Sequence, residues 1–547
     1  MKVKVFERIE LSFNAKVNFA VLTSKNGEKK ILEPFLYQPV EFIYNDEGIE
    51  KMSPCGQPYD MIRFTIKEEG YYILEIEFEN GEKESRNIEA KDFYNNGFVK
   101  VGKKDHRYFE FTNGKSFFPI AINTCYPEKI PVSDNTEFGV KGEYCYMGLR
   151  QYERWFKRLS QNGVNMARIW IGHPYFTPDT LDAQVLDLAQ FSKIDALVNL
   201  AKKYGIKLKI TFEQFRYTDP FGKGSQPDLS YIFNKKIRLN GKYCESINEW
   251  TTSEKWKNAW MNKVHEFAKR YAGDTEIFAF ELWNEMNCLP NTIEWNRDML
   301  PRVKEFFPDN MVINSLGSMD APHTVDFYNS FPWELSAFKQ LHRYLDQGAQ
   351  LKDTTRNPIE MTAQGIKYLQ KSAQPLILAE TGAVNNCHSG PFKYYSVDDR
   401  GMIFVDCVYT SVFCGFASTG NIWHWDDRYI ESKNMYKYYA PISKLVENID
   451  FTQEEFEPLD LSDNDVYLLI LKGKTQSIGF IRNKLDSWQN VLRDMKQTKA
   501  LHKKSFDFDC KTVGQVKIWD EDTTEISIND GKIVFDNLLY GTTFILK

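Results

Sequence analysis

Two glutamates at or near the C-terminal ends of predicted strands carry the chemistry of this sequence. Glu285 closes the apolar stretch "FAFELWNE", and Glu380 closes "LILAE" 95 residues later. That interval corresponds to three strand–helix units of about 30 residues each, which places both carboxylates at one rim of a repeating α/β fold. Two such carboxylates can cleave a glycosidic bond, one as the acid that protonates the leaving oxygen and the other as the nucleophile. Either glutamate alone could equally be a solvated strand end or a helix cap.

A third glutamate in the same stretch needs a different explanation. Residues four apart in an extended strand share a face and lie about 13 Å apart, so Glu281 and Glu285 cannot do the same job. The same alternation places Trp283 on the inward face with Glu281. A buried carboxylate without a partner would be strongly destabilising. Because Lys209 and Arg168 also point inward from neighbouring strands, we predict that one of them pairs with Glu281.

The elements that must position these residues alternate between apolar strands and amphipathic helices from about residue 108 onward. This pattern predicts strand–helix units and a parallel sheet. The predicted strands span residues 117–123, 165–171, 207–213, 278–287, 311–317, 339–344, 375–380 and 420–425. Eight such units over about 330 residues fit a closed (β/α)8 TIM barrel with enlarged loops.

Both flanks of the α/β region have a different pattern. Near the N-terminus, short alternating runs such as "YYILEIEFE" are separated by turn residues, which predicts a β-sandwich. After residue 450 short strands return in stretches such as "DVYLLILKG", which predicts a small C-terminal β-domain. We therefore expect three domains, at residues 1–95, 105–450 and 451–547.

The tripeptide "WNE" that ends at Glu285, with Glu380 three units later, resembles the signature of the retaining clan A glycoside hydrolases. These are the cellulase-, mannanase- and β-xylosidase-like barrels, and the resemblance covers about residues 108–447. It implies that Glu285 is the general acid/base and Glu380 the nucleophile. It also implies that Asn284 donates to the sugar 2-hydroxyl and that Arg168 keeps Glu380 ionised by its opposite charge.

The same resemblance implies further contacts with the sugar. The "HRY" of His342 to Tyr344 matches a sixth-strand His-x-Tyr, in which the tyrosine hydroxyl supports the nucleophile. In "WHWDD" the family places a tryptophan under the sugar; Trp425 lies nearer the rim than Trp423, and at least one of the two could be core. Asn123, at the end of the first strand, could contact sugar hydroxyls or be a satisfied turn asparagine. Further candidates for recognition at or beyond strand ends are His173, Glu213 and Gln214.

Composition excludes several classes of partner and cofactor. The net charge of −6 offers no basic surface for nucleic acid or anionic lipid. No segment approaches the length of a membrane span, and the first residues lack the apolar run of a signal peptide, so we expect a cytoplasmic protein. The nine cysteines form no CxxC or Cys/His cluster, and the histidines have no HxH or HExxH spacing. We therefore predict no metal and no other cofactor.

Together these features predict a retaining glycoside hydrolase that is exo-acting on imported oligosaccharides or glycosides. The alternative is a carbohydrate-binding barrel that has lost turnover, although a degenerate site would be expected to have lost some of Glu285, Glu380, Arg168 and Asn284. Transglycosylation through the same intermediate would differ only in the acceptor. A separation of about 6.5 to 9.5 Å between the carboxylates would instead indicate inversion. The sequence leaves open whether the accessory domains bind glycan, build the active-site wall or make a homo-oligomer.

Overall fold

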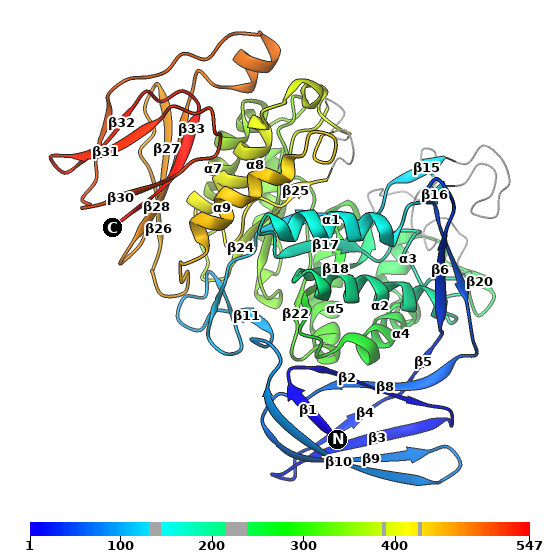
Figure 1. Ribbon diagram of the computed structural model, residues 1–547. Helices are drawn as coiled ribbons and strands as arrows, with labels where there is room; N and C mark the ends of the chain where they lie inside the picture. Colours follow the sequence, from blue (N-terminus) through cyan, green and yellow to red (C-terminus); the bar gives the residue numbers. More distant parts are fainter. Residues whose placement is uncertain (132–143, 181, 215–237, 386–389, 425–428) are drawn as a thin grey trace.

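The computed structural model describes residues 1–131, 144–180, 182–214, 238–385, 390–424 and 429–547. Figure 1 shows three groups of elements along the chain: N-terminal strands in blue, a central region of strands and helices from cyan to yellow, and C-terminal strands in orange and red. In the described part of the chain no helix combines the length and apolar character needed to cross a membrane.

The N-terminal strands form two sheets and a separate hairpin. Their bounds are β1 (Lys2–Val5), β2 (Arg8–Phe13), β3 (Val17–Ser24), β4 (Lys29–Leu32), β5 (Phe35–Tyr37), β6 (Val40–Tyr44), β7 (Glu50–Pro54), β8 (Tyr59–Thr65), β9 (Gly70–Phe78) and β10 (Lys83–Phe93). One sheet has the order β1-β10-β9-β3-β4 and the other β2-β8-β5, while β6 pairs with β7. Leu11 and Phe64 from the second sheet share a buried cluster with Leu22 and Ile76 from the first. The alternating pattern thus corresponds to real sheets with a common core.

The predicted first strand of the central region is divided into two. β13 (Ser116–Phe117) belongs to a small antiparallel sheet with β11 (Val99–Val101) and β12 (Phe109–Phe111), whereas the parallel strand β14 begins at Ala121. Pro119 lies between the two strands. A proline has no backbone N–H to donate to a ladder, which accounts for the break.

A strand lies within or overlaps each of the eight predicted central ranges. These strands are β14 (Ala121–Asn123), β17 (Met166–Trp170), β18 (Lys207–Gln214), β21 (Ile277–Asn284), β22 (Met311–Ile313), β23 (Lys339–His342), β24 (Leu376–Glu380) and β25 (Ile422–Trp423). Six of them are neighbours in the order β22-β21-β18-β17-β14-β25, and β23 pairs with β24. A parallel bridge joins Thr381 to Ile422, and the Ala337 N–H donates to the Val312 carbonyl at 3.0 Å. All their pairings are parallel, so their C-terminal ends meet at one edge.

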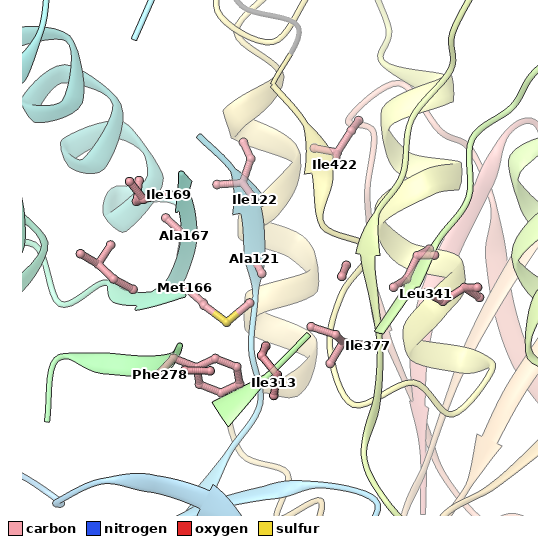
Figure 2. Close-up of a cluster of buried hydrophobic side chains, with 14 of the residues drawn as sticks. Ala121, Ile122, Met166, Ala167, Ile169, Phe278, Ile313, Leu341, Ile377 and Ile422 are labelled. Atoms are coloured by element: carbon pink, nitrogen blue, oxygen red, sulfur yellow. The ribbon is translucent and has the colours of Figure 1, made fainter. Parts of the chain in front are cut away.

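Helices alternate with these strands along the chain and pack against them. They are α1 (Leu149–Gln161), α2 (Leu188–Lys203), α3 (Ile247–Thr252), α4 (Glu254–Tyr271), α5 (Thr292–Phe306), α6 (Pro322–Ser330), α7 (Pro358–Tyr368), α8 (Met402–Phe413) and α9 (Tyr439–Val446). Strand side chains such as Ile122, Ala167 and Ile377 are fully buried (Figure 2). Phe212 of β18 stacks on Phe280 of β21 with ring centroids 5.6 Å apart. The apolar residues of each strand therefore lie in a continuous core.

The C-terminal strands form two further sheets. They are β26 (Glu457–Asp460), β27 (Val466–Lys472), β28 (Ser477–Asn483), β29 (Lys504–Asp507), β30 (Val513–Val516), β31 (Glu525–Asn529), β32 (Lys532–Asp536) and β33 (Gly541–Leu546). The sheet orders are β26-β27-β28-β33-β30 and β29-β32-β31. Leu468, Ile481, Phe535 and Phe544 share a buried cluster. Strands therefore replace the helix alternation where the sequence changes pattern.

Buried ion pairs attach the N-terminal sheets to the central region. Arg63 of β8 binds Asp195 of α2 through two hydrogen bonds of 2.9 and 3.1 Å, and both side chains are buried. Two further short strand pairs, β15 (Lys129–Pro131) with β16 (Tyr144–Tyr146) and β19 (Arg238–Leu239) with β20 (Lys242–Tyr243), precede α1 and α3. The β6–β7 hairpin extends from the N-terminal sheets toward β15 and β16 (Figure 1). The N-terminal part of the chain thus contacts the central region through the Arg63–Asp195 ion pair, and its β6–β7 hairpin extends toward β15 and β16.

Candidate functional site

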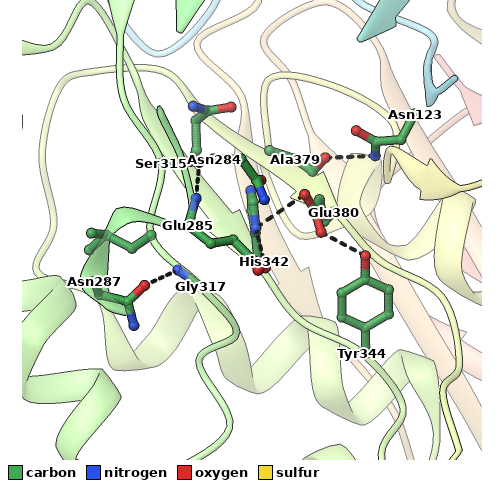
Figure 3. A network of polar contacts seen from close by, with 12 residues as sticks. Asn123, Asn284, Glu285, Asn287, Ser315, Gly317, His342, Tyr344, Ala379 and Glu380 are labelled. Atoms are coloured by element: carbon green, nitrogen blue, oxygen red, sulfur yellow. Dashed lines mark hydrogen bonds and ion pairs between the residues drawn. The ribbon is translucent and has the colours of Figure 1, made fainter. Parts of the chain in front are cut away.

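The ends of β21 and β24 bring Glu285 and Glu380 together (Figure 3). An oxygen of each carboxylate and a ring nitrogen of His342 lie within 4.8 Å of one another. His342 Nδ1 is 3.0 Å from Glu285 Oε1 and 3.5 Å from Glu380 Oε1. The Glu380 side chain is fully buried, whereas that of Glu285 retains 12% of its exposure. The two carboxylates therefore lie side by side, and Glu285 is the one that solvent reaches.

Arg168 of β17 is the centre of a buried charge network. Its Nε and Nη2 each donate to an oxygen of Glu281 at 2.8 Å, and its Nη1 donates to Glu380 Oε1 at 2.5 Å. The predicted pairing of Glu281 with a cation is confirmed. Burial alone would raise the pKa of Glu281, but Arg168 and Lys209 outweigh it and hold that pKa at about 2. Glu281 therefore stays ionised and compensates the charge of Arg168 inside the fold.

Lys209 of β18 completes this network below the rim. Its ammonium donates to Gln340 Oε1 at 2.5 Å and lies 3.9 Å from Glu281 Oε2. Complete burial lowers the pKa of Lys209 to about 7. Arg168, which cannot lose its proton in a protein, therefore keeps its positive charge under conditions in which Lys209 can be neutral.

Both oxygens of Glu380 have a donor. Oε1 accepts from Arg168, and Oε2 accepts from the Tyr344 hydroxyl at 2.7 Å. Hydrogen bonds to the charged form of a carboxylate favour that form and also hold its orientation. The contacts expected for Arg168 and Tyr344 are therefore present, and they orient Glu380 beside Glu285.

Asn284 presents an unused donor at the same place. Its Oδ1 accepts from Arg168 Nη2 at 2.8 Å. Its Nδ2 is buried and has no hydrogen-bond partner within the described ranges of the chain. A buried donor without a partner is costly, so a ligand hydroxyl that accepts from it would bind favourably.

The backbone at Glu285 is unusual for a residue with a side chain. Glu285 has φ +55° and ψ +50°, in the left-handed region, directly after β21 ends at Asn284. Its N–H donates to the Ser315 hydroxyl at 3.1 Å, and Asn287 accepts from the Gly317 N–H at 2.5 Å (Figure 3). Such a conformation costs on the order of 1 kcal/mol and persists where the surroundings hold it. The turn brings the Glu285 carboxylate against His342.

Trp283 does not lie on the inward face, where the alternation of the strand predicted it. Its ring packs against Trp250 of α3 and Trp295 of α5, with centroids 4.8 and 6.1 Å apart. Its backbone N–H donates to Asn314 Oδ1 at 2.7 Å. The adjacent Asn284 instead contacts Arg168, which also binds Glu281. The regular alternation of strand faces therefore ends before the rim.

The contacts of Asn123 favour its structural interpretation. Its amide Nδ2 donates to the carbonyls of Ala379 at 2.9 Å and Asn421 at 2.7 Å. Its Oδ1 accepts from Arg168 at 3.4 Å, and the side chain is buried. Asn123 thus ties β14 to the chain around β24 and β25 and supports Arg168, rather than offering free hydrogens to a sugar.

The tryptophans expected under the sugar have different outcomes. Trp423 is 6% exposed and belongs to a small cluster with Tyr344 and Trp170 at the site. Its ring centroid is 5.0 Å from that of Trp170. Trp425, which lies nearer the rim in sequence, falls outside the described residues. Of these two tryptophans, only Trp423 lies in the described part of the chain, and it contacts the site.

The three further recognition candidates lie at the same edge but have different surroundings. Glu213 accepts from Trp260 Nε1 at 3.0 Å and contacts Lys263, both from α4. Gln214 pairs in register with Asn284 at the ends of β18 and β21. His173 stacks on the ring of Tyr126. Glu213 is thus held by a helix, whereas His173 lines the site.

A group of aromatic residues lies beside this cluster and is here called the aromatic wall: Tyr126, His173 and Tyr146. Sequence reasoning had singled out His173 and missed the two tyrosines. Tyr126 stacks on His173 with centroids 4.4 Å apart and planes at 8°, and Tyr146 meets His173 edge-on at 5.8 Å. Tyr126 packs against the cluster that contains Trp423. Tyr126 and Tyr146 lie in irregular or short segments, where no periodicity marked them.

The donor set Glu285, His342 and Glu380 has the spacing of a three-ligand metal site. Arg168 and Tyr344 already bind both oxygens of Glu380, and the guanidinium brings a positive charge within 2.5 Å of one of them. A cation would be repelled at that position. The residues therefore suit proton transfer and nucleophilic attack better than metal binding.

Comparison with known proteins places this geometry in context. Residues 133–399 match the model of the family Cellulase (glycosyl hydrolase family 5). A probable mannan endo-1,4-beta-mannosidase F from Aspergillus flavus is 25% identical over 304 residues, which cover 48% of this chain and 62% of that protein. Cellodextrinase A from Ruminococcus flavefaciens is 26% identical over 182 residues, which cover 32% of this chain and 44% of that protein. The chain thus spans about three fifths of the length of the first relative and less of the second.

One solved structure resembles the chain over its whole length. A Bacteroides vulgatus protein proposed to be a glycoside hydrolase has a TM-score of 0.57 at 13% identity, covering 100% of this chain and 99% of that one. At this identity the likeness concerns the fold alone. It extends through the N-terminal, central and C-terminal elements.

Proposed function

From the premise that residues 133–399 contain a clan A glycoside hydrolase domain, we propose that the protein hydrolyses β-linked oligosaccharides or polysaccharides with retention of configuration. Glu380 attacks the anomeric carbon, while Glu285 protonates the glycosidic oxygen, which leaves with the aglycone. Water then attacks the glycosyl ester on Glu380, and Glu285 takes its proton, so both carboxyl groups return to their starting state.

The observation that carries this proposal is the separation of the two carboxylates. Oxygens of Glu285 and Glu380 lie within 4.8 Å. Retaining enzymes need about 5 to 5.5 Å, whereas an inverting enzyme needs about 6.5 to 9.5 Å to admit water between the carboxylates. Arg168 and Tyr344 hold the Glu380 carboxylate in place, and the free Asn284 Nδ2 is suited to the sugar 2-hydroxyl.

We propose a β-1,4-linked mannan or manno-oligosaccharide as the first substrate to test. The support is the name of the Aspergillus relative, a mannan endo-1,4-beta-mannosidase. The exo mode expected from the sequence and the endo mode in that name predict different products. An exo enzyme releases one small sugar from the first minute, whereas an endo enzyme first produces a ladder of intermediate lengths.

We also propose that the eight parallel strands close into a (β/α)8 TIM barrel at residues 105–450, between an N-terminal β-sandwich at 1–95 and a C-terminal β-domain at 451–547. The Thr381–Ile422 bridge supports closure between β24 and β25, and the Ala337 to Val312 hydrogen bond supports it between β22 and β23. The rim of such a barrel is where its active sites are built.

The test compares wild type, Glu380→Ala and Glu285→Ala on p-nitrophenyl β-glycosides of mannose, glucose, xylose and galactose, on p-nitrophenyl α-L-arabinofuranoside and on β-1,4-mannan. Glu294→Ala, an exposed glutamate of α5, is the control and should keep wild-type rates. We expect Glu380→Ala to be inactive and Glu285→Ala to retain part of the aryl glycoside activity, because nitrophenol leaves without acid help.

Azide distinguishes the two roles. Added azide should restore Glu380→Ala by forming the α-glycosyl azide, and should accelerate Glu285→Ala by forming the β-glycosyl azide, because azide replaces a different carboxylate in each. Undiminished hydrolysis by Glu380→Ala would contradict the assignment. Saturable binding of manno-oligosaccharides without hydrolysis of any substrate by wild type would favour the carbohydrate-binding alternative.

A further inference from the structure

One carboxylate of the N-terminal hairpin reaches the edge where the site lies. Glu50, the first residue of β7, is only 9% exposed. It accepts hydrogen bonds from the Tyr44 hydroxyl at 2.8 Å, from the Leu149 N–H at 2.7 Å and from the Tyr175 hydroxyl at 2.6 Å. Tyr44 belongs to the same hairpin, whereas Leu149 and Tyr175 belong to the central region. The carboxylate therefore joins the two regions.

The central region is shaped to receive this carboxylate. Gly148 has φ +61°, and a Cβ at this position would lie 2.3 Å from Glu50 Oε2, so a larger residue would expel the side chain. The guanidinium of Arg150 lies 3.9 Å above the ring of Tyr44. The docking thus combines a glycine that permits close approach, a cation–π contact and three hydrogen bonds.

Tyr175 connects Glu50 to the aromatic wall. Burial, reinforced by the nearby Glu50 charge, raises the pKa of Tyr175 well above its usual value, so its hydroxyl remains a donor. Its carbonyl accepts from the Lys193 ammonium at 3.0 Å. Its N–H donates to His173 Nδ1 at 3.2 Å, and its ring lies 5.2 Å from that of Tyr146. Tyr175 therefore holds two of the three wall residues.

The wall packs against the buried cluster beside the carboxylates. His173 stacks on Tyr126, and Tyr126 lies 5.7 Å from Trp170 between ring centroids. Trp170 and Tyr344 belong to one buried cluster, and Tyr344 donates to Glu380. The N-terminal hairpin is thus linked to the proposed nucleophile through the wall and this cluster. Tyr126 and Tyr146 are half-buried and keep part of their surface open.

We propose that Glu50 is a positioning residue through which the N-terminal hairpin holds the aromatic wall, and that the wall binds sugar units next to the one that is cleaved. The second half rests on the proposed function. Aromatic side chains combine a flat apolar face with polar tips, which suits the face of a pyranose ring. The N-terminal region is then part of the active-site wall, rather than a separate glycan-binding module.

The test measures kcat and KM on mannohexaose, together with calorimetric affinity for the same sugar in the inactive Glu380→Ala background if the wild type cleaves it. Glu50→Ala should raise KM about tenfold or more and weaken binding equally, with kcat changed less than twofold, because the wall does not touch the reacting atoms. Glu50→Gln, which keeps the shape and one acceptor oxygen, should recover part of the loss. Glu47→Ala, an exposed glutamate in the turn of the same hairpin, is the matched control.

Tyr175→Phe provides a second variant if Glu50→Ala fails to fold, because it removes one hydrogen bond and keeps the ring. An unchanged KM and affinity in a folded Glu50→Ala or Tyr175→Phe protein would overturn the proposal. A fall in kcat with unchanged KM, alongside a lower melting temperature, would also overturn it by showing a merely structural role.

The same measurements distinguish failure of the hydrolase proposal from failure of the aromatic-wall proposal. A wild type that cleaves nothing, but binds mannohexaose more tightly than Glu50→Ala, would refute hydrolysis and support the positioning role. A wild type that hydrolyses aryl mannosides but gains no affinity from the longer sugar would refute the wall as a sugar site and leave the hydrolase standing.

Discussion

The Arg168–Glu281 pair should make the free energy of unfolding depend on pH in a way that one substitution can isolate. Glu281→Gln keeps the size of the side chain and removes its charge. The pKa of Glu281 is lowered from 4.5 to about 2 in the folded protein. Its stabilisation is therefore fully present above pH 4.5 and is lost as the pH falls through 2.

The magnitude follows from that difference in pKa. At about 1.4 kcal/mol per pKa unit, the ionised carboxylate contributes about 3 kcal/mol at pH 7. At pH 3 the same relation leaves about 1 kcal/mol, because Glu281 is mostly protonated in the unfolded chain at that pH. A buried ion pair broken on one side typically costs about 3 to 5 kcal/mol, which agrees with the value at neutral pH.

The assay is urea unfolding followed by tryptophan fluorescence, for wild type and Glu281→Gln at several pH values from 7 to 3. Trp283 and Trp295 are buried in the central region and report its transition. We expect the deficit of the variant to shrink by about 2 kcal/mol between pH 7 and pH 3. Glu305→Gln, on the exposed face of α5, should stay within about 0.5 kcal/mol of wild type at both. A deficit that does not change with pH would refute the reasoning.

Three other substitutions test separate contacts. Tyr344→Phe removes a charge-assisted hydrogen bond to Glu380, so kcat/KM should fall about 10- to 100-fold with little change in melting temperature; an unchanged kcat/KM would contradict the contact. Asn284→Ala should lower kcat/KM about 100-fold on a normal glycoside and much less on its 2-deoxy analogue, and equal losses on both would exclude a role at the 2-hydroxyl. Arg63→Ala should lower the free energy of unfolding by about 3 kcal/mol, measured by urea unfolding, because Asp195 stays buried without its partner. A loss below about 1 kcal/mol would show that this ion pair does not stabilise the attachment of the N-terminal sheets.

Local patterns in the sequence already specify the strands and the residues at their ends. Alternating and continuous apolar runs marked each of the eight central ranges in which a strand lies. The alternation of faces also identified Arg168 and Lys209 as inward cations, and the cost of burying Glu281 required one of them as its partner. These features are local or follow from a general energetic rule, so they can be predicted from one chain.

The alternation of faces fails at the end of β21, although its ladder with β18 continues to Asn284. Trp283 packs against helices and Asn284 contacts Arg168, at the place where the backbone N–H of Trp283 donates to the side chain of Asn314 and the left-handed Glu285 follows. The face of a strand-end residue therefore depends on partners from other strands. Similarly, Asn123 is occupied by carbonyls more than 250 residues away, which its own neighbours in sequence do not reveal.

Sequence by itself determined which residue types stand at the strand ends, including the two glutamates 95 residues apart. Only the tertiary structure decided that their oxygens lie within 4.8 Å and that His342 lies between them. Likewise, only the tertiary structure joined Glu50 to Tyr175, which is 125 residues further along the chain. Periodicity encodes the face that a residue presents, whereas contacts between distant segments depend on how those segments pack together in the folded chain.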